Sequence, residues 1–339
     1  MLTLKQLEKT FGAGTASAHH ALCGIDLTLQ DGEFVTVIGS NGAGKSTLFG
    51  AVSGSFFVDR GRIVLDGEDI TYLPEHKRAK RIARIFQDPM RGTAPDLTLE
   101  ENVALAYARA GGHLFAPALP RKKRAFFREQ LARLDMGLED RMKTRIGLLS
   151  GGQRQAVTLL MATINTPRVL LLDEHTAALD PVVAERVLHI TQDIVAENHI
   201  TTMMVTHNIG AALSLGTRTI MLERGRIVLD LSGETRDRLD VPGLLALYRE
   251  ACGAELDFYG EFYAALCGAP ALPVLPSAKV GRGLRPAGAR KGTRKRAFFD
   301  LPFGNIWILW MKNEGGKRTG CCFFRGRVGG KRENSKNLP

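Results

Sequence analysis

A glycine-rich loop between an apolar run and a helical segment constrains this chain more than any other feature. Residues 39–47, GSNGAGKST, fit the pattern G-x-x-x-x-G-K-[ST] and follow FVTVI. In such a loop, backbone N–H groups converge on phosphate oxygens at a helix N-terminus. The alternative, a plain glycine-rich turn, is disfavoured by this context. The predicted nucleotide-contacting residues are Gly39, Ser40, Asn41, Gly42, Ala43, Gly44, Lys45, Ser46 and Thr47.

The chemistry expected of this loop depends on its two last polar positions and on a second motif. Lys45 places a positive charge on the β- and γ-phosphates, and Ser46 offers its hydroxyl to Mg²⁺. The continuous apolar run VLLLDE is typical of a strand buried on both faces of a parallel sheet, and it ends in Asp173 and Glu174. We expect Asp173 to hold Mg²⁺ through water and Glu174 to polarise the attacking water. The alternative is that two acids simply end a buried strand at the surface.

Strand-like and helix-like segments alternate over the first 257 residues. Strands are expected at 2–11, 25–30, 33–39, 61–70, 81–87, 168–174, 200–207 and 217–231, the last a hairpin turning at Arg224-Gly225. Residues from Asp88 to about 165 have a helical pattern, with Thr98 and Glu101 as a capping box. The predicted fold class is therefore α/β, with a mixed sheet core, an N-terminal antiparallel β region and an inserted helical subdomain at about 88–165.

The net charge is unevenly distributed along the chain. The 339-residue chain has a net charge of +11, but residues 258–339 hold 16 Lys/Arg and only 4 Asp/Glu, so residues 1–257 are close to neutral. A nucleic-acid footprint is therefore missing from the body. Five cysteines without CxxC spacing favour a reducing cytoplasm. No apolar run has the length of a membrane span, and the first residues lack the pattern of a secretory signal.

Residues 258–339 form a basic tail rich in Gly, Pro and Arg, for which we predict disorder. Three interpretations stay open: a basic arm for anionic lipid or nucleic acid, a dispensable extension, or sequence translated beyond a frameshift. A second basic run, RKKRAFFRE at 121–129, falls inside the helical subdomain. We interpret it as a solvated helix start, with a contact patch for a membrane subunit or anionic lipid as the alternative.

The motifs LLSGGQRQ at 148–155 and VLLLDEHTAALD at 169–180 resemble the signature and hydrolysis motifs of the ABC-type ATPases. The resemblance covers residues 1–257 and implies the P-loop NTPase fold of the ABC ATPase type. By this resemblance, Gln87 in IFQDP senses Mg²⁺ and the attacking water. His207 in VTHN reaches the γ-phosphate and holds the catalytic Glu174. Asp180 in AALD contacts the partner subunit, and Phe11 stacks on adenine, although a core phenylalanine is the alternative.

The resemblance also implies a head-to-tail homodimer. Each ATP lies between the glycine loop of one subunit and the signature of the other. The residues Ser150, Gly151, Gly152 and Gln153 then serve the partner's ATP, and loss of the γ-phosphate opens the pair. The chain departs from many relatives at His175, where they have proline. This histidine is either an added titratable group beside the γ-phosphate or, in the interpretation we favour, a variant that packs on its loop.

Two function classes compete under this resemblance. One is the ATP-hydrolysing motor of a membrane transporter. The other is a soluble ABC ATPase that acts on ribosomes or DNA. A single cassette, a short gap between motifs without heptads and a neutral body favour the transporter. The resemblance then implies a separate multi-span permease, a substrate-binding protein and a peripheral place on the cytoplasmic face of the inner membrane. It points to uptake of an aromatic amino acid or similar small solute, with export as the alternative.

Overall fold

The structure is a computed structural model that describes residues 1–111, 121–252, 306–312 and 318–325. The chain divides into two compact units, residues 1–272 and 273–339. The described helices of the first unit are α1 (Lys45–Ser53), α2 (Glu75–Arg78), α3 (Leu99–Gly111), α4 (Arg121–Ala132), α5 (Gly151–Thr163), α6 (Pro181–Asn198), α7 (Ile209–Ser214), α8 (Gly233–Asp237) and α9 (Val241–Cys252), with 3₁₀ turns η1 (Pro89–Gly92) and η2 (Ile146–Leu148). Within these residues no helix combines the length and the apolar character that a membrane span requires.

An antiparallel sheet opens the fold, in the order β2-β1-β4-β5. Its strands are β1 (Leu2–Phe11), β2 (His19–Leu29), β4 (Arg60–Leu65) and β5 (Glu68–Asp69). The predicted strand at 25–30 is the second half of β2, because β2 pairs with the whole of β1 back to His19. The antiparallel β region expected at the N-terminus is therefore confirmed, and the strand predicted at 61–70 is divided into β4 and β5 by a turn at Asp66-Gly67.

A second sheet carries the motifs, in the order β10-β9-β3-β8-β7-β6. Its strands are β3 (Phe34–Gly39), β6 (Ile82–Ile85), β7 (Val169–Asp173), β8 (Thr201–Val205), β9 (Arg218–Glu223) and β10 (Arg226–Ser232). Strands β6, β7, β8, β3 and β9 run parallel, and every residue of β7 and β8 is buried, as the continuous apolar runs predict. The β9–β10 turn occurs at Arg224-Gly225, where both φ angles are positive, as a two-residue hairpin requires.

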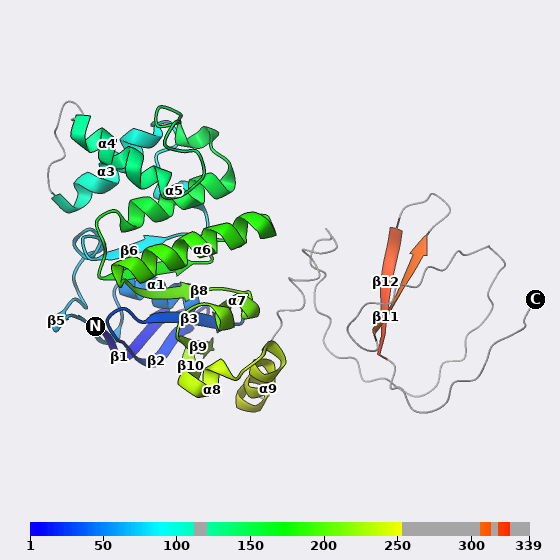
Figure 1. Ribbon diagram of the computed structural model, residues 1–339. Coiled ribbons are helices and arrows are strands. Elements are labelled where there is room, and N and C mark those ends of the chain that lie inside the picture. Colours follow the sequence, from blue (N-terminus) through cyan, green and yellow to red (C-terminus); the bar gives the residue numbers. More distant parts are fainter. Residues whose placement is uncertain (112–120, 253–305, 313–317, 326–339) are drawn as a thin grey trace, which may run out of the picture. The chain divides into compact units, whose positions relative to one another are not determined.

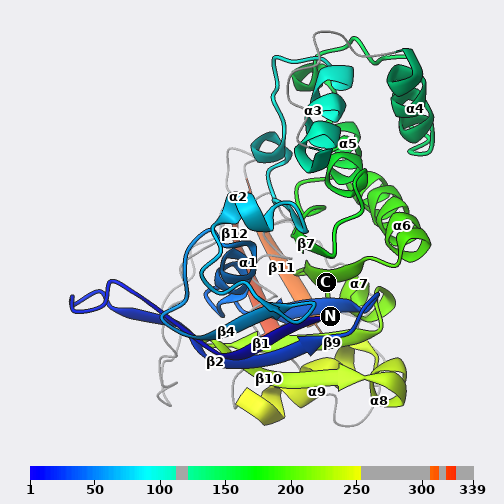
Figure 2. The ribbon, with the colours of Figure 1, turned by 90° about the vertical axis from the view of Figure 1, so that its left-hand side faces the viewer.

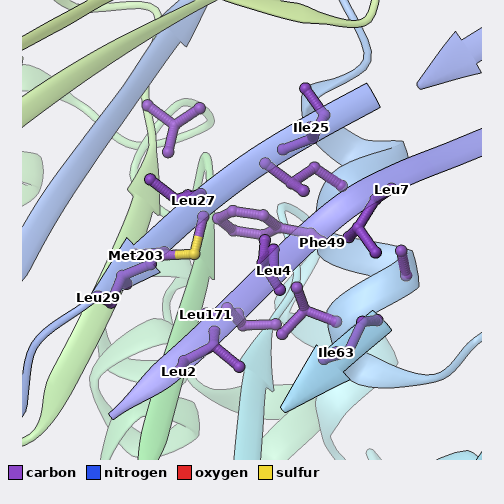
Figure 3. Close-up of a cluster of buried hydrophobic side chains, with 14 of the residues drawn as sticks. Leu2, Leu4, Leu7, Ile25, Leu27, Leu29, Phe49, Ile63, Leu171 and Met203 are labelled. Atoms are coloured by element: carbon purple, nitrogen blue, oxygen red, sulfur yellow. The ribbon is translucent and has the colours of Figure 1, made fainter. Parts of the chain in front are cut away.

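The main core lies between the two sheets and around α1 (Figure 3). Leucines of β1 and β2 pack toward Phe49 of α1, Leu171 of β7 and Met203 of β8. Leu2, Leu4 and Leu7 of β1 are its buried residues, and a register shift between Leu4 and Leu7 interrupts the alternation while keeping Leu7 on the core side. The helix that follows the glycine loop, α1, therefore packs against residues of both sheets.

The helical subdomain has a core of its own. Leu99 and Val103 of α3 pack with Phe127 and Leu131 of α4 and with the apolar face of α5. The predicted capping box is formed: the backbone N–H of Thr98 donates to Oε2 of Glu101 at 2.7 Å, and the N–H of Glu101 to Oγ1 of Thr98 at 3.3 Å. Figures 1 and 2 show α3, α4 and α5 gathered at one end of the unit, away from the antiparallel sheet.

The basic run 121–129 begins α4. Residues 121–125 are exposed, and Arg124 pairs with Glu100 through a 2.9 Å contact from Nε. Phe127, by contrast, is fully buried. The run is thus a solvated helix start with one apolar anchor, as interpreted from the sequence.

In the second unit, β11 (Ile306–Lys312) and β12 (Arg318–Arg325) form an antiparallel pair. Both strands lie inside the 258–339 tail, for which no strand was predicted. The segments IWILWMK and CCFF are rich in β-branched and aromatic residues, which favour strands. Apolar and polar residues do not alternate in them, so the periodicity of a half-buried strand is missing. The boundary at 257/258 and the disorder predicted for the rest of the tail fall largely on residues outside the described ones and stay predictions.

Candidate functional site

The glycine loop holds a backbone conformation that only glycine fits. Gly39 and Gly44 have φ angles of 153° and 103°, and a Cβ would lie 2.2 Å from the Leu222 carbonyl oxygen or 2.5 Å from that of Ala21. Gly44 is also the N-cap of α1, and no side chain caps the helix. No side chain therefore competes for the N-terminus of α1, which makes it a candidate anion site.

Lys45 is buried within this loop. Its Nζ donates to the carbonyl oxygens of Gly39 at 2.7 Å and Ser40 at 3.0 Å, and the residue is 6% exposed. Ser46, one position on, is exposed. The loop thus arranges a cation and a hydroxyl at the start of one helix, as predicted.

Hydrogen bonds through Glu223 connect the loop to α9. The Ser40 hydroxyl donates to Oε2 of Glu223 at 2.6 Å, and the Tyr248 hydroxyl donates to the same oxygen at 2.8 Å. Burial and the Glu223 carboxylate raise the pKa of Tyr248, so its hydroxyl remains a donor. Sequence reasoning missed Glu223 and Tyr248, because neither belongs to a recognisable motif.

The acidic residues meet at the carboxyl edge of the parallel sheet. Asp173 ends β7 opposite Val205 of β8, and His207 follows β8 two residues later. Glu174, next to Asp173, has a φ of 49°, an uncommon backbone conformation that directs the chain out of the strand. Its Oε1 lies 2.6 Å from Nε2 of His207. The two residues expected to work together are therefore in contact.

Oxygen donors suited to Mg²⁺ lie at or beyond the carboxyl ends of β3, β6 and β7, which run parallel in one sheet. They are the Ser46 hydroxyl, the Asp173 carboxylate and the amide of Gln87, which is exposed two residues beyond β6. The described residues contain no cluster of three or more His, Cys, Asp or Glu side chains that could hold a metal alone. Mg²⁺ usually takes one or two protein oxygens together with phosphates and waters, so this donor set fits a metal that shares its ligands with a nucleotide.

A residue missed by sequence reasoning contacts the same carboxylate. Nη2 of Arg84 in β6 donates to Oδ2 of Asp173 at 2.7 Å. A basic residue inside the apolar segment RIARIFQ was the available signal, since buried charges need a partner.

The signature residues begin α5. Ser150 is its N-cap, and a capping box links it to Gln153 through backbone N–H bonds of 3.3 Å in each direction. A Cβ on Gly152 would lie 2.1 Å from Cγ1 of Val183, whereas one on Gly151 would meet its nearest atom, in Leu179, at an ordinary 3.4 Å. Gly152 therefore lets α5 start against α6, while Ser150 and Gly151 are exposed.

Two further predicted residues lie at the ends of elements. Asp180 is exposed and is the N-cap of α6, with Pro181 at the first helical position. Phe11 ends β1, is 41% exposed and meets Phe56 edge-on at a ring separation of 5.3 Å. The alternative of a core phenylalanine does not fit this exposure.

His175 is buried, not open to the phosphate side. It is 3% exposed, and its Nε2 lies 3.3 Å from the Oγ1 of Thr191, which itself donates to the Val187 carbonyl in α6. Burial lowers its pKa to about 4. The favoured interpretation of a packed residue fits this burial, but the contact that the structure shows is with α6 and not with the loop itself.

Comparisons with known proteins show the family of the chain. The family model for ABC transporters matches residues 22–177. The chain is 41% identical over 251 residues to the tyrosine transport ATP-binding protein of Clostridioides difficile, covering 74% of this chain and 100% of that one. It is 32% identical over 251 residues to the spermidine/putrescine import ATP-binding protein PotA of Haemophilus influenzae, covering 74% of this chain and 62% of that one.

A solved structure gives the same match in three dimensions. The dimeric post-hydrolysis state of the ATP-binding cassette MJ0796, bound to ADP and Pi, is 29% identical with a TM-score of 0.58. The match covers 68% of this chain and 98% of that one. The predicted α/β fold of the ABC ATPase type is thereby confirmed. The glycine loop, the acidic strand end and the signature lie within residues 22–177, and this chain is an ATPase of the ABC transporter family.

Proposed function

We propose that this chain is the motor subunit of a bacterial ABC transporter that imports a small solute, working as a head-to-tail homodimer on a separate multi-span permease. The contact between Glu174 and His207 carries the ATP-hydrolysing part of this proposal, because it gives a water-activating carboxylate a fixed orientation. Its place would be peripheral, on the cytoplasmic face of the inner membrane. The named transport relatives support it.

In this proposal each side chain has a separate task at the ATP. The N–H groups of α1 and Lys45 bind the phosphates, and Phe11 stacks on adenine. Asp173, Ser46 and Gln87 would hold Mg²⁺, which when bound offsets the charge of the β- and γ-phosphates. Glu174 accepts a proton from the attacking water, and His207 donates a hydrogen bond that keeps the carboxylate in place.

In this proposal the N-terminus of α5 binds the ATP that the partner subunit holds, while the N-terminus of α1 binds the chain's own ATP. Ser150, Gly151 and Gln153 at the start of α5 contact the γ-phosphate that the partner holds, and Asp180 lies in the same interface. The dimeric state of the similar cassette supports this assembly. Closure would then require ATP on both sides, and loss of the γ-phosphate would release it.

A membrane preparation tests the partner. The full chain and residues 1–257 are purified from their native membrane, and co-purifying proteins are identified. A multi-span permease held by both forms, and also by the Lys45→Ala variant, supports the proposal, because docking on the permease does not need nucleotide. Ribosomes or nucleic acid held by residues 1–257 without a membrane protein would favour the soluble ABC ATPase instead.

For the solute, we propose an aromatic amino acid delivered by a substrate-binding protein, on the strength of the tyrosine transport relative. Cells that carry Glu174→Gln in place of the wild-type gene should lose uptake of labelled tyrosine and keep uptake of spermidine as a control. Unchanged tyrosine uptake would contradict this solute. Accumulation of an exported compound in the same cells would point to export.

A further inference from the structure

Arg84 is placed by the sheet beside the carboxylate proposed for the metal. It pairs with Leu171 across the β6–β7 ladder, and Asp173 lies two residues further along β7, so both side chains leave the sheet on the same face. Nη2 of Arg84 lies 2.7 Å from Oδ2 of Asp173, and the two side chains are only 14% and 11% exposed. The ion pair is thus largely shielded from water and fixed by strand register.

The contacts of Arg84 differ from those of the buried structural arginines. Arg78 donates to four backbone carbonyls at 2.7–3.0 Å, namely those of Ala51, Val52, Thr71 and Leu73. Arg84 has one short bond, to Asp173, and a second contact of 3.5 Å to the Ser53 hydroxyl. Its Nε is buried with no hydrogen-bond partner. Asp173 is therefore its main compensation, and Arg84 does not serve to cap carbonyl groups.

An aromatic ring holds the guanidinium from another side. The Arg84 guanidinium carbon lies 4.9 Å from the ring centroid of Phe86, and that of Arg91 lies 4.7 Å from the same ring. Cation–π attraction of this kind adds to the ion pair, so turning Arg84 away from Asp173 would lose both. Phe86 directly precedes Gln87, so Arg84 contacts both Asp173 and the ring next to Gln87 in the sequence.

We propose that Arg84 is a positioning residue that neutralises Asp173 and makes metal binding at this carboxylate depend on nucleotide. This inference rests on the proposed role of Asp173. The positive guanidinium of Arg84 repels a divalent cation that arrives without nucleotide. One arriving with ATP brings phosphate charge that outweighs this repulsion. Arg84 contacts Oδ2, which leaves Oδ1 for the water shell of the metal.

Binding of Mn²⁺ in the absence of nucleotide tests this inference, with electron paramagnetic resonance to count the bound ion in the full chain. Arg84→Met should bind one Mn²⁺ with a half-saturating concentration at least about tenfold below that of the wild type. Adding Asp173→Asn should abolish the gain. Arg81→Met is the matched control, because Arg81 precedes the same strand but pairs with the exposed Glu68 at 2.8 Å. It should bind Mn²⁺ like the wild type.

A gain of metal binding separates this role from a structural one, since a merely structural arginine would only lose function on substitution. If Arg84→Met does not fold, the comparison of Arg84→Gln with Arg84→Lys replaces it, and only the uncharged variant should gain the ion. Equal nucleotide-free Mn²⁺ binding in the charged and uncharged variants, or a gain that survives Asp173→Asn, overturns the inference. Failure of the wild type to bind Mg²⁺-ATP would overturn the proposed function instead.

Discussion

At the scale of single residues, Glu174 makes the sharpest prediction. Glu174→Gln removes the proton acceptor but keeps the side-chain shape, so ATP should still bind while turnover falls by at least about 10²-fold. Phosphate release and size-exclusion chromatography with ATP measure both effects, and under the proposed function the variant accumulates as a dimer. Phosphate release at the wild-type rate would remove Glu174 from this role.

Lys45→Ala is the companion change in the phosphate loop. The variant loses the buried ammonium that lies on the loop carbonyls. Its affinity for a fluorescent ATP analogue should fall by roughly tenfold or more, because a charge-assisted contact to phosphate is lost. Binding equal to that of the wild type would contradict the phosphate-loop assignment.

His175 predicts a pH dependence of stability. Its pKa is about 4 in the folded protein against 6.5 for an ordinary histidine, so the folded state favours the neutral form. The stability contribution is complete above pH 6.5 and is lost as the pH falls toward 4, by up to about 3 kcal/mol. Urea unfolding between pH 4 and 8 should show this loss in the wild type. His175→Gln should show a smaller loss over the same interval, and identical slopes would disprove the assignment.

The same scale shows the limit of sequence reasoning. Lys45, Asp173, Glu174 and His207 were predictable because their chemistry is written in short motifs with fixed neighbours. Arg84 was not, because its partner lies 89 positions away and only strand register brings the two together. Phe11 was predicted to stack on adenine from its position in the sequence alone, and it is exposed because it is the last residue of β1.

At the scale of elements, the contact between α5 and α6 makes a matched pair of predictions. Gly152→Ala drives a Cβ into Val183, so it should lower the free energy of unfolding by about 1–3 kcal/mol. Gly151→Ala meets only an ordinary contact and should leave stability unchanged or slightly higher, since alanine favours helix. Thermal unfolding measures both. Equal stability of the two variants would mean that the helices separate at no cost.

Elements were predicted well where one local signal dominated. The β9–β10 turn and the Thr98 capping box follow from residues that neighbour each other in sequence. The start of β2 could not be predicted in this way, because it depends on pairing with β1. The β11–β12 pair was also missed, because its strands lack the alternation that marks a half-buried strand.

At the scale of the whole molecule, the first unit should function by itself. All four described hydrophobic clusters lie within it, and the last buried residue among them is Tyr248. Residues 1–272 should therefore keep the ATPase rate and the melting temperature of the full chain. Steady-state hydrolysis and calorimetry compare the two forms. A shorter chain that melts well below the full chain would show that the second unit contributes to the fold.

The order of strands in the second sheet has a consequence for how the molecule is made. β3 lies between β8 and β9, and Ser40 is hydrogen-bonded through Glu223 to Tyr248. The phosphate loop therefore packs against residues that are synthesised much later than the loop itself. Such non-local pairing slows folding, since long loops must close before any contact rewards them. A nascent chain that has emerged only as far as α5 already carries every residue of the glycine loop, yet it lacks both neighbours of β3. Nucleotide binding should therefore be acquired late in synthesis, in a single step.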